Sequence, residues 1–219
     1  MSGVDPRGDP HAGRPVLAAG APLGAARAAM VLLHGRGAGA ADILGLHREL
    51  AVPDVAFLAP QAAGGTWYPY SFLAPLERNE PWLGSALAVV HRLLSQVEAQ
   101  GVGPERTVLL GFSQGACLAL EAAARRPRGR GGVVGLSGGL IGPPGTVRDD
   151  AGDCAGTPVF LGCSDRDPHV PWERVEESAA VFRRLGAAVT LRMYPGLGHT
   201  VNEDELAWVG DLLRRVTRT

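Results

Sequence analysis

The chain contains no lysine, because all 21 of its Lys-plus-Arg residues are arginines. Schiff-base and pyridoxal enzymes, Ser-Lys dyads and P-loop proteins each need an amine or ammonium group, so these classes are excluded. Cysteine is scarce as well: Cys117, Cys154 and Cys163 are odd in number and show no Cys-x-x-Cys spacing. This pattern argues against a disulfide framework and against a zinc site, and it favours a reducing, cytoplasmic setting.

Long apolar runs and runs of like charge are also missing. No stretch of ~18 uninterrupted apolar residues is present, so the sequence predicts no stable membrane insertion. Residues 16–33 are rich in Ala and Gly, but Pro22 and Arg27 interrupt them and no basic segment comes directly before a continuous apolar core. This argues against a secretory signal. The net charge of −1 argues against nucleic acid, and against an anionic membrane surface, as an obligate partner.

The length of 219 residues and the apolar share of 46% fit one globular domain with a sizeable core. Residues 1–14 are polar and rich in Gly and Pro, so we expect a flexible N-terminal tail with a solvated His11, followed by a single domain over 15–219. Strand-like segments lie at 29–34, 55–58, 108–110, around 133–134, 159–162 and 188–194. Helix-like segments separate them, including 42–50 and one that Asn79 is expected to cap with Pro81 in its first turn. The alternation predicts a mostly parallel sheet with helices on both faces and a site at the carboxyl ends of the strands.

Residues 111–115 read Gly-Phe-Ser-Gln-Gly, between an apolar strand-like run and an alanine-rich helix-like segment. This context is typical of a nucleophile elbow, although an ordinary glycine-rich turn is the alternative. In an elbow two glycines give the room that the strained Ser113 needs, and the Gln114 amide lies at a helix N-terminus where it can stabilise an oxyanion. A second Gly-x-Ser-x-Gly at 135–139 is followed by Gly and Pro residues that cannot form a helix. We therefore expect Ser137 in a loop near the site.

The segment 35–40, which follows the first expected strand, has two interpretations. After His34 it fits the second half of an oxyanion hole, with the Arg36 amide pointing at the site. It also satisfies the dinucleotide fingerprint Gly-x-Gly-x-x-Gly/Ala. The fingerprint requires an acidic residue at the end of the next strand, which here ends in Ala-Pro-Gln, while Asp54 lies at the wrong end. This misplacement disfavours the nucleotide interpretation.

Aromatic residues are concentrated in the segment 66–73. It contains Trp67, Tyr68, Tyr70, Phe72 and the apolar Leu73. Such a loop is either a satellite packing cluster or the wall of an apolar substrate pocket, and the sequence leaves both open.

Three polar residues directly follow three separate expected strands, in the order Ser113, Asp167, His199. This is the order of nucleophile, acid and histidine in α/β-hydrolases. A serine hydroxyl needs a neutral histidine to take its proton, and a carboxylate on the other ring nitrogen fixes the tautomer. Asp165 competes for the acid role, but Pro168 stiffens the turn after Asp167, and we assign Asp165 to shaping the loop.

These motifs together resemble the phospholipase/carboxylesterase family of α/β-hydrolases, over most of the chain from about Met30 onward. The residues that carry the resemblance are Leu33-His34-Gly35-Arg36-Gly37-Ala38, Ala59-Pro60-Gln61, Trp67-Tyr68, Gly111-Phe112-Ser113-Gln114-Gly115, Leu136-Ser137-Gly138, Asp167-Pro168-His169-Val170-Pro171 and Gly198-His199. The resemblance implies a triad of Ser113, Asp167 and His199, with the amides of Arg36 and Gln114 as the oxyanion hole. It also implies hydrolysis of esters or thioesters without a cofactor, and often homodimerisation.

Arg36 and the aromatic segment make the chain more similar to the small bacterial carboxylesterases than to the acyl-protein thioesterases of that family. We expect a serine carboxylesterase that hydrolyses small to medium esters through an acyl-enzyme on Ser113. No insertion is long enough for a separate lid domain. Thioesterase or lysophospholipase activity, a dienelactone-hydrolase-like activity on lactones, and a non-catalytic hydrolase-fold binding protein are the alternatives. Dienelactone hydrolases usually carry cysteine where this chain has Ser113.

Overall fold

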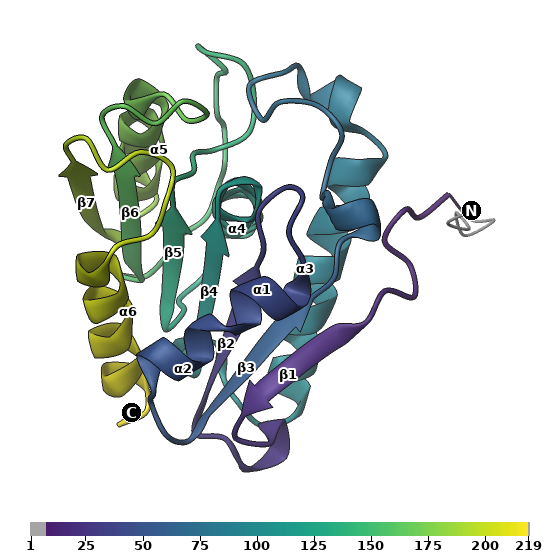
Figure 1. Cartoon of the computed structure of the whole chain (residues 1–219), viewed down its shortest axis with the longest axis vertical. Coiled ribbons are helices and arrows are strands. Elements are labelled where there is room, and N and C mark those ends of the chain that lie inside the picture. The colour runs from purple at the N-terminus through teal and green to yellow at the C-terminus, as the bar shows by residue number, and fades with distance from the viewer. Residues whose placement is uncertain (1–7, 219) are drawn as a thin grey trace.

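A seven-stranded sheet runs through the computed structural model, which describes residues 8–218 (Figure 1). Its strand order is β1-β3-β2-β4-β5-β6-β7. The strands are β1 (Val16–Gly20), β2 (Ala28–Leu33), β3 (Val55–Pro60), β4 (Thr107–Phe112), β5 (Gly132–Leu136), β6 (Pro158–Ser164) and β7 (Ala188–Tyr194). β1 pairs with β3 antiparallel and every other pairing is parallel, which confirms the mostly parallel sheet.

Within residues 8–218, six α-helices cover the two faces of the sheet. They are α1 (Ala40–Leu44), α2 (Leu46–Leu50), α3 (Trp82–Ala99), α4 (Gln114–Arg125), α5 (Trp172–Arg184) and α6 (Glu203–Val216). Helices α3, α4 and α5 pack on one face, and α1, α2 and α6 pack on the other (Figure 1). Each face has its own hydrophobic core. Along β2, Val31 and Leu33 pack in the core under α3, α4 and α5, while Met30 and Leu32 pack in the core under α1, α2 and α6, as strand alternation requires. This is the α/β-hydrolase arrangement that the sequence predicts.

The edge strand β1 was not expected, because residues 16–20 lack a strong strand pattern. Its residues are mostly exposed, and it forms by pairing with β3, from Val16 opposite Pro60 to Gly20 opposite Ala56. An edge strand with little buried surface takes its stability from backbone pairing with a distant segment, which a local sequence pattern does not record.

His11, which was expected to be solvated, is buried. Its ring lies between the indoles of Trp67 and Trp82, at 5.5 and 5.4 Å between centroids. Its Nε2 lies 2.9 Å from the Trp67 carbonyl oxygen, and its Nδ1 accepts a hydrogen bond from the amide of Ala63. Residues 8–14 therefore pack on the domain, whereas residues 1–7 of the expected tail lie outside the described residues.

Two helix starts also differ from expectation. Helix α3 begins at Trp82, and Asn79 is not its cap: the buried Asn79 side chain accepts from the Tyr70 amide and donates to the Ser71 carbonyl. The segment 42–50 forms two short helices that meet at Gly45. Among residues 8–218, the structure has no helix that is both long enough and apolar enough to span a membrane.

Candidate active site

The turn at Ser113 has the backbone geometry of a nucleophile elbow. Strand β4 ends at Phe112 and α4 begins at Gln114, so Ser113 alone connects them, with φ 56° and ψ −120°. A non-glycine residue rarely adopts a positive φ outside a functional or strained turn. The Ser113 amide donates to the carbonyl oxygen of Leu136 in β5, at 2.9 Å, which holds the turn against the sheet.

The two glycines of the motif are sterically required. A Cβ atom on Gly111 would lie 2.1 Å from the carbonyl oxygen of Gly115, and a Cβ on Gly115 would lie 2.1 Å from that of Leu33. Both contacts are with backbone atoms, which cannot move aside without moving the strand or the helix. Only glycine therefore lets the chain turn within one residue here.

Ser113 is the first member of a hydrogen-bonded chain of three side chains. The loops after β6 and β7 bring Asp167 and His199 to the carboxyl edge of the sheet, where β4 also ends. His199 Nε2 lies 2.8 Å from Ser113 Oγ, and His199 Nδ1 lies 2.7 Å from Asp167 Oδ2. The Asp167 side chain is fully buried, whereas that of His199 is 18% exposed. The structure thus brings together the three residues that were singled out from the sequence.

The surroundings of Asp167 favour its charged form. Burial on its own raises the pKa of this carboxyl. The hydrogen bonds from His199 and from the amides of His169 and Val170 have the opposite and larger effect, so the pKa of Asp167 lies below the ordinary value. An ionised carboxylate only accepts hydrogen bonds, so Nδ1 of His199 is the nitrogen that donates. Nε2 is then free to accept the proton of Ser113.

Asp165 lies in the same loop and contacts neither His199 nor Ser113. Its Oδ1 accepts a hydrogen bond from the amide of Gly196, at 2.7 Å. The hydroxyl of Ser164 similarly accepts from the amide of Gly198. Both residues hold the loop that carries His199, which is the shaping role expected for Asp165.

A cavity of about 480 Å³ opens at Ser113. It is lined by Gly35, Arg36, Ala38, Tyr68, Pro69, Tyr70, Ser71, Phe72, Phe112, Ser113, Gln114, Cys117, His169, Val170 and His199. Of the six residues expected to form the substrate pocket, Tyr68, Tyr70 and Phe72 are therefore on its wall.

Trp67, Leu73 and Ser137 are not part of the cavity wall. Trp67 is fully buried, and its indole N–H donates to the His34 carbonyl at 2.9 Å. Leu73 packs against the core, and the buried Ser137 hydroxyl has no hydrogen-bond partner among residues 8–218. The two interpretations of the aromatic segment are thus both partly right, because one side of the loop packs and the other faces the cavity.

Two side chains fix this aromatic loop to the rest of the site. The Arg36 guanidinium donates to the carbonyl oxygens of Tyr68, Pro69 and Tyr70, at 2.9, 2.9 and 2.7 Å. The Gln114 amide group accepts from the Trp67 amide at 2.9 Å and donates to the Tyr68 carbonyl at 2.8 Å. The two residues assigned to the oxyanion hole therefore also position the wall of the cavity.

Sequence reasoning assigned no pocket role to several residues that line the cavity, and His169 and Cys117 are two of them. The His169 ring meets that of His199 edge to face, at 4.8 Å between centroids. Cys117 is buried one helical turn after Ser113, and burial raises the pKa of its thiol to about 12. Both could have been found from the sequence. Cys117 comes four residues after Ser113, which is one helical turn, and His169 comes two residues after Asp167. Within the described part of the chain, no group of His, Cys, Asp and Glu side chains could hold a metal ion.

Comparison with known proteins agrees with this geometry. Residues 17–217 match the family model described as phospholipase/carboxylesterase. The crystal structure of a phospholipase/carboxylesterase from Dyadobacter fermentans DSM 18053 superimposes with a TM-score of 0.88 at 43% identity, covering 92% of this chain and 96% of that one. Acyl-protein thioesterase 1 of Gibberella zeae is 38% identical over 147 residues, which are 64% of this chain and 61% of that protein.

Carboxylesterase SOBER1 of Arabidopsis thaliana is 25% identical over 67% of this chain and 64% of its own length. The chain thus spans less than two thirds of the length of these two curated relatives. The family model, in contrast, covers almost the whole of the described sheet and its helices. The chain belongs to the phospholipase/carboxylesterase family.

Proposed function

We propose that the protein is a serine carboxylesterase that hydrolyses small to medium carboxylic esters through an acyl-enzyme on Ser113. The observation that carries this proposal is the unbroken chain of hydrogen bonds from Ser113 Oγ through His199 to Asp167, with the serine on a strained elbow at the mouth of a cavity. An activated hydroxyl in such a place is suited to acyl transfer.

In the first half of the proposed reaction, Ser113 Oγ attacks the ester carbonyl while its proton moves to Nε2 of His199. The imidazolium that forms is stabilised by the Asp167 carboxylate at 2.7 Å. His199 then gives this proton to the departing alcohol. In the second half, His199 takes a proton from water, which attacks the acyl-Ser113 ester. The proton then passes from His199 to Ser113 Oγ as the acid is released.

The negative charge on the carbonyl oxygen needs donors, and we assign this role to the backbone amides of Arg36 and Gln114. Both residues line the cavity. No hydrogen bond from either amide is recorded within residues 8–218, so both donors are available to a ligand. Gln114 is also the first residue of α4, where the helix dipole favours negative charge. Loss of one such donor typically costs ~3 kcal/mol of transition-state stabilisation.

The cavity supports esters of modest size. Tyr68, Phe72 and Val170 give it an apolar wall, while the loops around it carry no separate lid domain. Thioesters and lysophospholipids are the second candidate class, because a relative of this chain is named an acyl-protein thioesterase. Lactones of the dienelactone type are a weaker candidate, since the nucleophile position holds serine. The proposed steps require neither a metal nor a cofactor.

The chain offers a matched pair of variants to test this proposal, because it contains two Gly-x-Ser-x-Gly motifs. Ser113→Ala is expected to lower kcat by at least ~10⁴-fold with an unchanged circular dichroism spectrum. Ser137→Ala, in the motif without a helix behind it, should keep most of the activity. A fluorophosphonate probe should label the parent and Ser137→Ala but not Ser113→Ala. Labelling of Ser113→Ala, or its retained esterase activity, would reject the assignment.

Substrate class is decided by hydrolysis rates across a panel of aryl and alkyl esters of varied acyl length, with thioesters and lactones included. Failure to label the parent protein, together with binding of esters without turnover, would instead support a catalytically silent binding protein. A homodimer and a cytoplasmic location are further parts of the proposal. The first rests on the family resemblance and is tested by sedimentation, and the second is supported by three buried, free thiols.

A further inference from the structure

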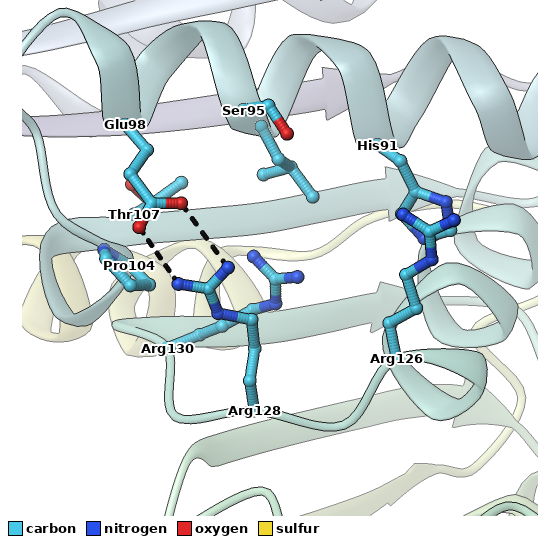
Figure 2. Close-up of a pocket in the computed structure, with 9 residues that line it drawn as sticks. His91, Ser95, Glu98, Pro104, Thr107, Arg126, Arg128 and Arg130 are labelled. Atoms are coloured by element: carbon cyan, nitrogen blue, oxygen red, sulfur yellow. Dashed lines mark hydrogen bonds and ion pairs between the residues drawn. The ribbon is translucent and has the colours of Figure 1, made fainter.

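A second pocket lies at the opposite end of the sheet from Ser113 (Figure 2). Thr107, the first residue of β4, lines it, whereas Ser113 follows the last residue of the same strand. Thr107 and Ser113 are six positions apart along the strand, which is ~20 Å at the usual rise per residue. The pocket encloses about 60 Å³ and is lined by His91, Leu94, Ser95, Glu98, Pro104, Thr107, Arg126, Arg128 and Arg130. We call it the arginine pocket.

Positive charge in the arginine pocket exceeds negative charge. Three guanidinium groups line it, and Glu98 is its single carboxylate. Glu98 is engaged by Arg128, through two hydrogen bonds of 3.1 and 3.3 Å (Figure 2). Neither Arg126 nor Arg130 makes a side-chain hydrogen bond or an ion pair within residues 8–218. Two positive charges are therefore left without a counter-ion.

Arg130 is the most constrained of the three arginines. Burial and then the neighbouring Arg128 lower the pKa of its guanidinium to about 10, and the opposing influence of Cys154 and Glu98 is smaller. Proteins rarely keep a partly buried cation next to a like charge without a partner. None of the guanidinium nitrogens of Arg130 is both buried and unbonded, so the nitrogens that lack a partner are accessible from outside the core.

The neighbouring groups add hydrogen-bond donors and no further negative charge. The Ser95 hydroxyl makes no hydrogen bond within the described residues and lies on the pocket wall formed by α3. The ring of His91, within electrostatic reach of Arg126 and Arg130, has its Nε2 3.3 Å from the Ala122 carbonyl oxygen. Burial, opposed by that hydrogen bond and reinforced by the arginines, lowers the pKa of His91.

We propose that the arginine pocket binds a small phosphate-type dianion. Guanidinium groups present planar pairs of N–H donors that match the oxygens of phosphate, and two excess positive charges match the charge of a dianion. A volume of about 60 Å³ admits one such group, since a single water needs only ~10–15 Å³. A larger molecule would place only its phosphate in the pocket. The ligand is thus either free inorganic phosphate or the phosphate of a monoester.

The site is independent of ester hydrolysis, because it lies at the other end of β4 and shares no residue with the cavity at Ser113. It therefore stands even if the proposed esterase activity fails. A ligand that binds only the folded state raises the melting temperature in proportion to the logarithm of its concentration over Kd. Thermal unfolding thus reports the site without any catalytic assay.

The experiment compares Tm in sodium phosphate with Tm in sodium chloride of equal ionic strength, for the parent protein, Arg130→Met and Arg48→Met. Arg48 is an exposed arginine on α2 with no recorded side-chain partner within residues 8–218, and it serves as the matched control. At tenfold excess over Kd, phosphate is expected to raise the Tm of the parent and of Arg48→Met by roughly 4 °C. Arg130→Met should lose this gain and show an unchanged or higher Tm in chloride.

The comparison of variants separates site binding from general salting effects, because phosphate is excluded from all three surfaces alike. Equal phosphate gains in the parent and in Arg130→Met would overturn the proposal, as would no gain beyond chloride in the parent. A second arm replaces inorganic phosphate by glycerol phosphate. An equal gain identifies a phosphomonoester group as sufficient, and a gain with inorganic phosphate alone restricts the site to the free ion. Calorimetric titration with phosphate should show one site in the parent and none in Arg130→Met.

Discussion

The two ends of strand β4 carry polar groups in opposite states of pairing. At the carboxyl end both ring nitrogens of His199 are engaged, and Asp167 accepts hydrogen bonds from His199 and two backbone amides. At the amino end Arg128 pairs with Glu98, whereas the guanidinium groups of Arg126 and Arg130 make no recorded hydrogen bond or ion pair in the described part of the chain. The same strand thus begins beside unmatched charge and ends beside a matched network.

The difference follows from when the charge arises. In the proposed mechanism the imidazole starts neutral, and the carboxylate is already placed for the positive charge that the reaction creates. The donors left free there are two amides, which point to a negative charge that exists only in the transition state. In the arginine pocket the imbalance is present in the resting protein. The proposed dianion would balance this charge from outside the chain.

Among the variants considered, Asp167→Asn is expected to have the largest effect on the hydrogen-bonded network of Ser113, His199 and Asp167. An amide at this position can donate to Nδ1 of His199, which moves the imidazole proton to Nε2 and leaves no acceptor for Ser113. We expect kcat to fall by about 10³–10⁴-fold with little change in KM. Steady-state kinetics on an aryl ester measures both values.

Asp165→Asn is the control for that variant, because Asp165 lies in the same loop and bonds only to backbone and to Ser164. Its loss should cost less than about 10-fold through a looser loop around His199. If Asp165→Asn proves the more damaging of the two, the carboxylate of the triad has been assigned to the wrong residue.

A smaller effect is expected from Arg36, whose side chain connects the oxyanion loop to the aromatic loop. Arg36→Met keeps the backbone amide but removes three hydrogen bonds to consecutive carbonyls. Two of these bonds are exposed and the one to Tyr68 is half-buried, so we expect kcat/KM to fall by about 10-fold rather than more. Arg36→Lys should recover part of the loss, since an ammonium has three donors but not the planar fork.

Arg78→Met tests whether any arginine near this loop has the same effect. Arg78 lies over the ring of Tyr70, at 4.3 Å from its centroid, and its side chain has no recorded hydrogen bond within residues 8–218. Its loss should change kcat/KM by less than about 2-fold. Equal losses in the Arg36 and Arg78 variants would mean that the carbonyl bonds do not position the site.

The elbow could be predicted from sequence because its cause is local. The contacts that forbid a side chain at Gly111 and Gly115 involve backbone within a few residues of Ser113 or in the adjoining strand. The order of Ser113, Asp167 and His199 could be predicted for a related reason: parallel strands put their carboxyl ends at one edge, so residues that follow different strands meet there.

What could not be predicted depends on contacts between distant segments. Trp67 and Tyr68 are neighbours with the same local signal and are both fully buried, yet only Tyr68 lines the cavity, while the Trp67 indole donates to the His34 carbonyl. Asn79 is a residue type that often caps helices, but its side-chain amide is hydrogen-bonded to the backbone of the aromatic loop at Tyr70 and Ser71. His11 is buried only because two indoles from other segments enclose it. In each case tertiary contacts override the local preference.

Glu205 extends the comparison to a buried carboxyl group, and its replacement is expected to have the smallest effect, which is on stability. It is fully buried, its Oε2 accepts from the Asn202 amide, and its Oε1 has no partner among the described residues. Burial raises the pKa of Glu205 from 4.5 to about 7, against the Asn202 hydrogen bond and with help from Asp204. The folded state thus holds the proton more tightly than the unfolded state. The contribution of this proton to the free energy of unfolding is fully present below about pH 4.5 and is lost as pH rises through about 7.

Glu205→Gln removes this titration while keeping an acceptor for the Asn202 amide. A shift of this size corresponds to on the order of 3 kcal/mol above pH 7, but the new amide N–H₂ lacks a partner, so we expect a net gain of only about 1 kcal/mol at pH 8.5. At pH 5 the variant should match or fall below the parent. Urea unfolding at both pH values measures the difference. Glu203→Gln, on the exposed first turn of the same helix, should show no such change of sign. A Glu205→Gln variant that is less stable than the parent at pH 8.5 would show that the buried carboxylate stabilises the fold in its charged form.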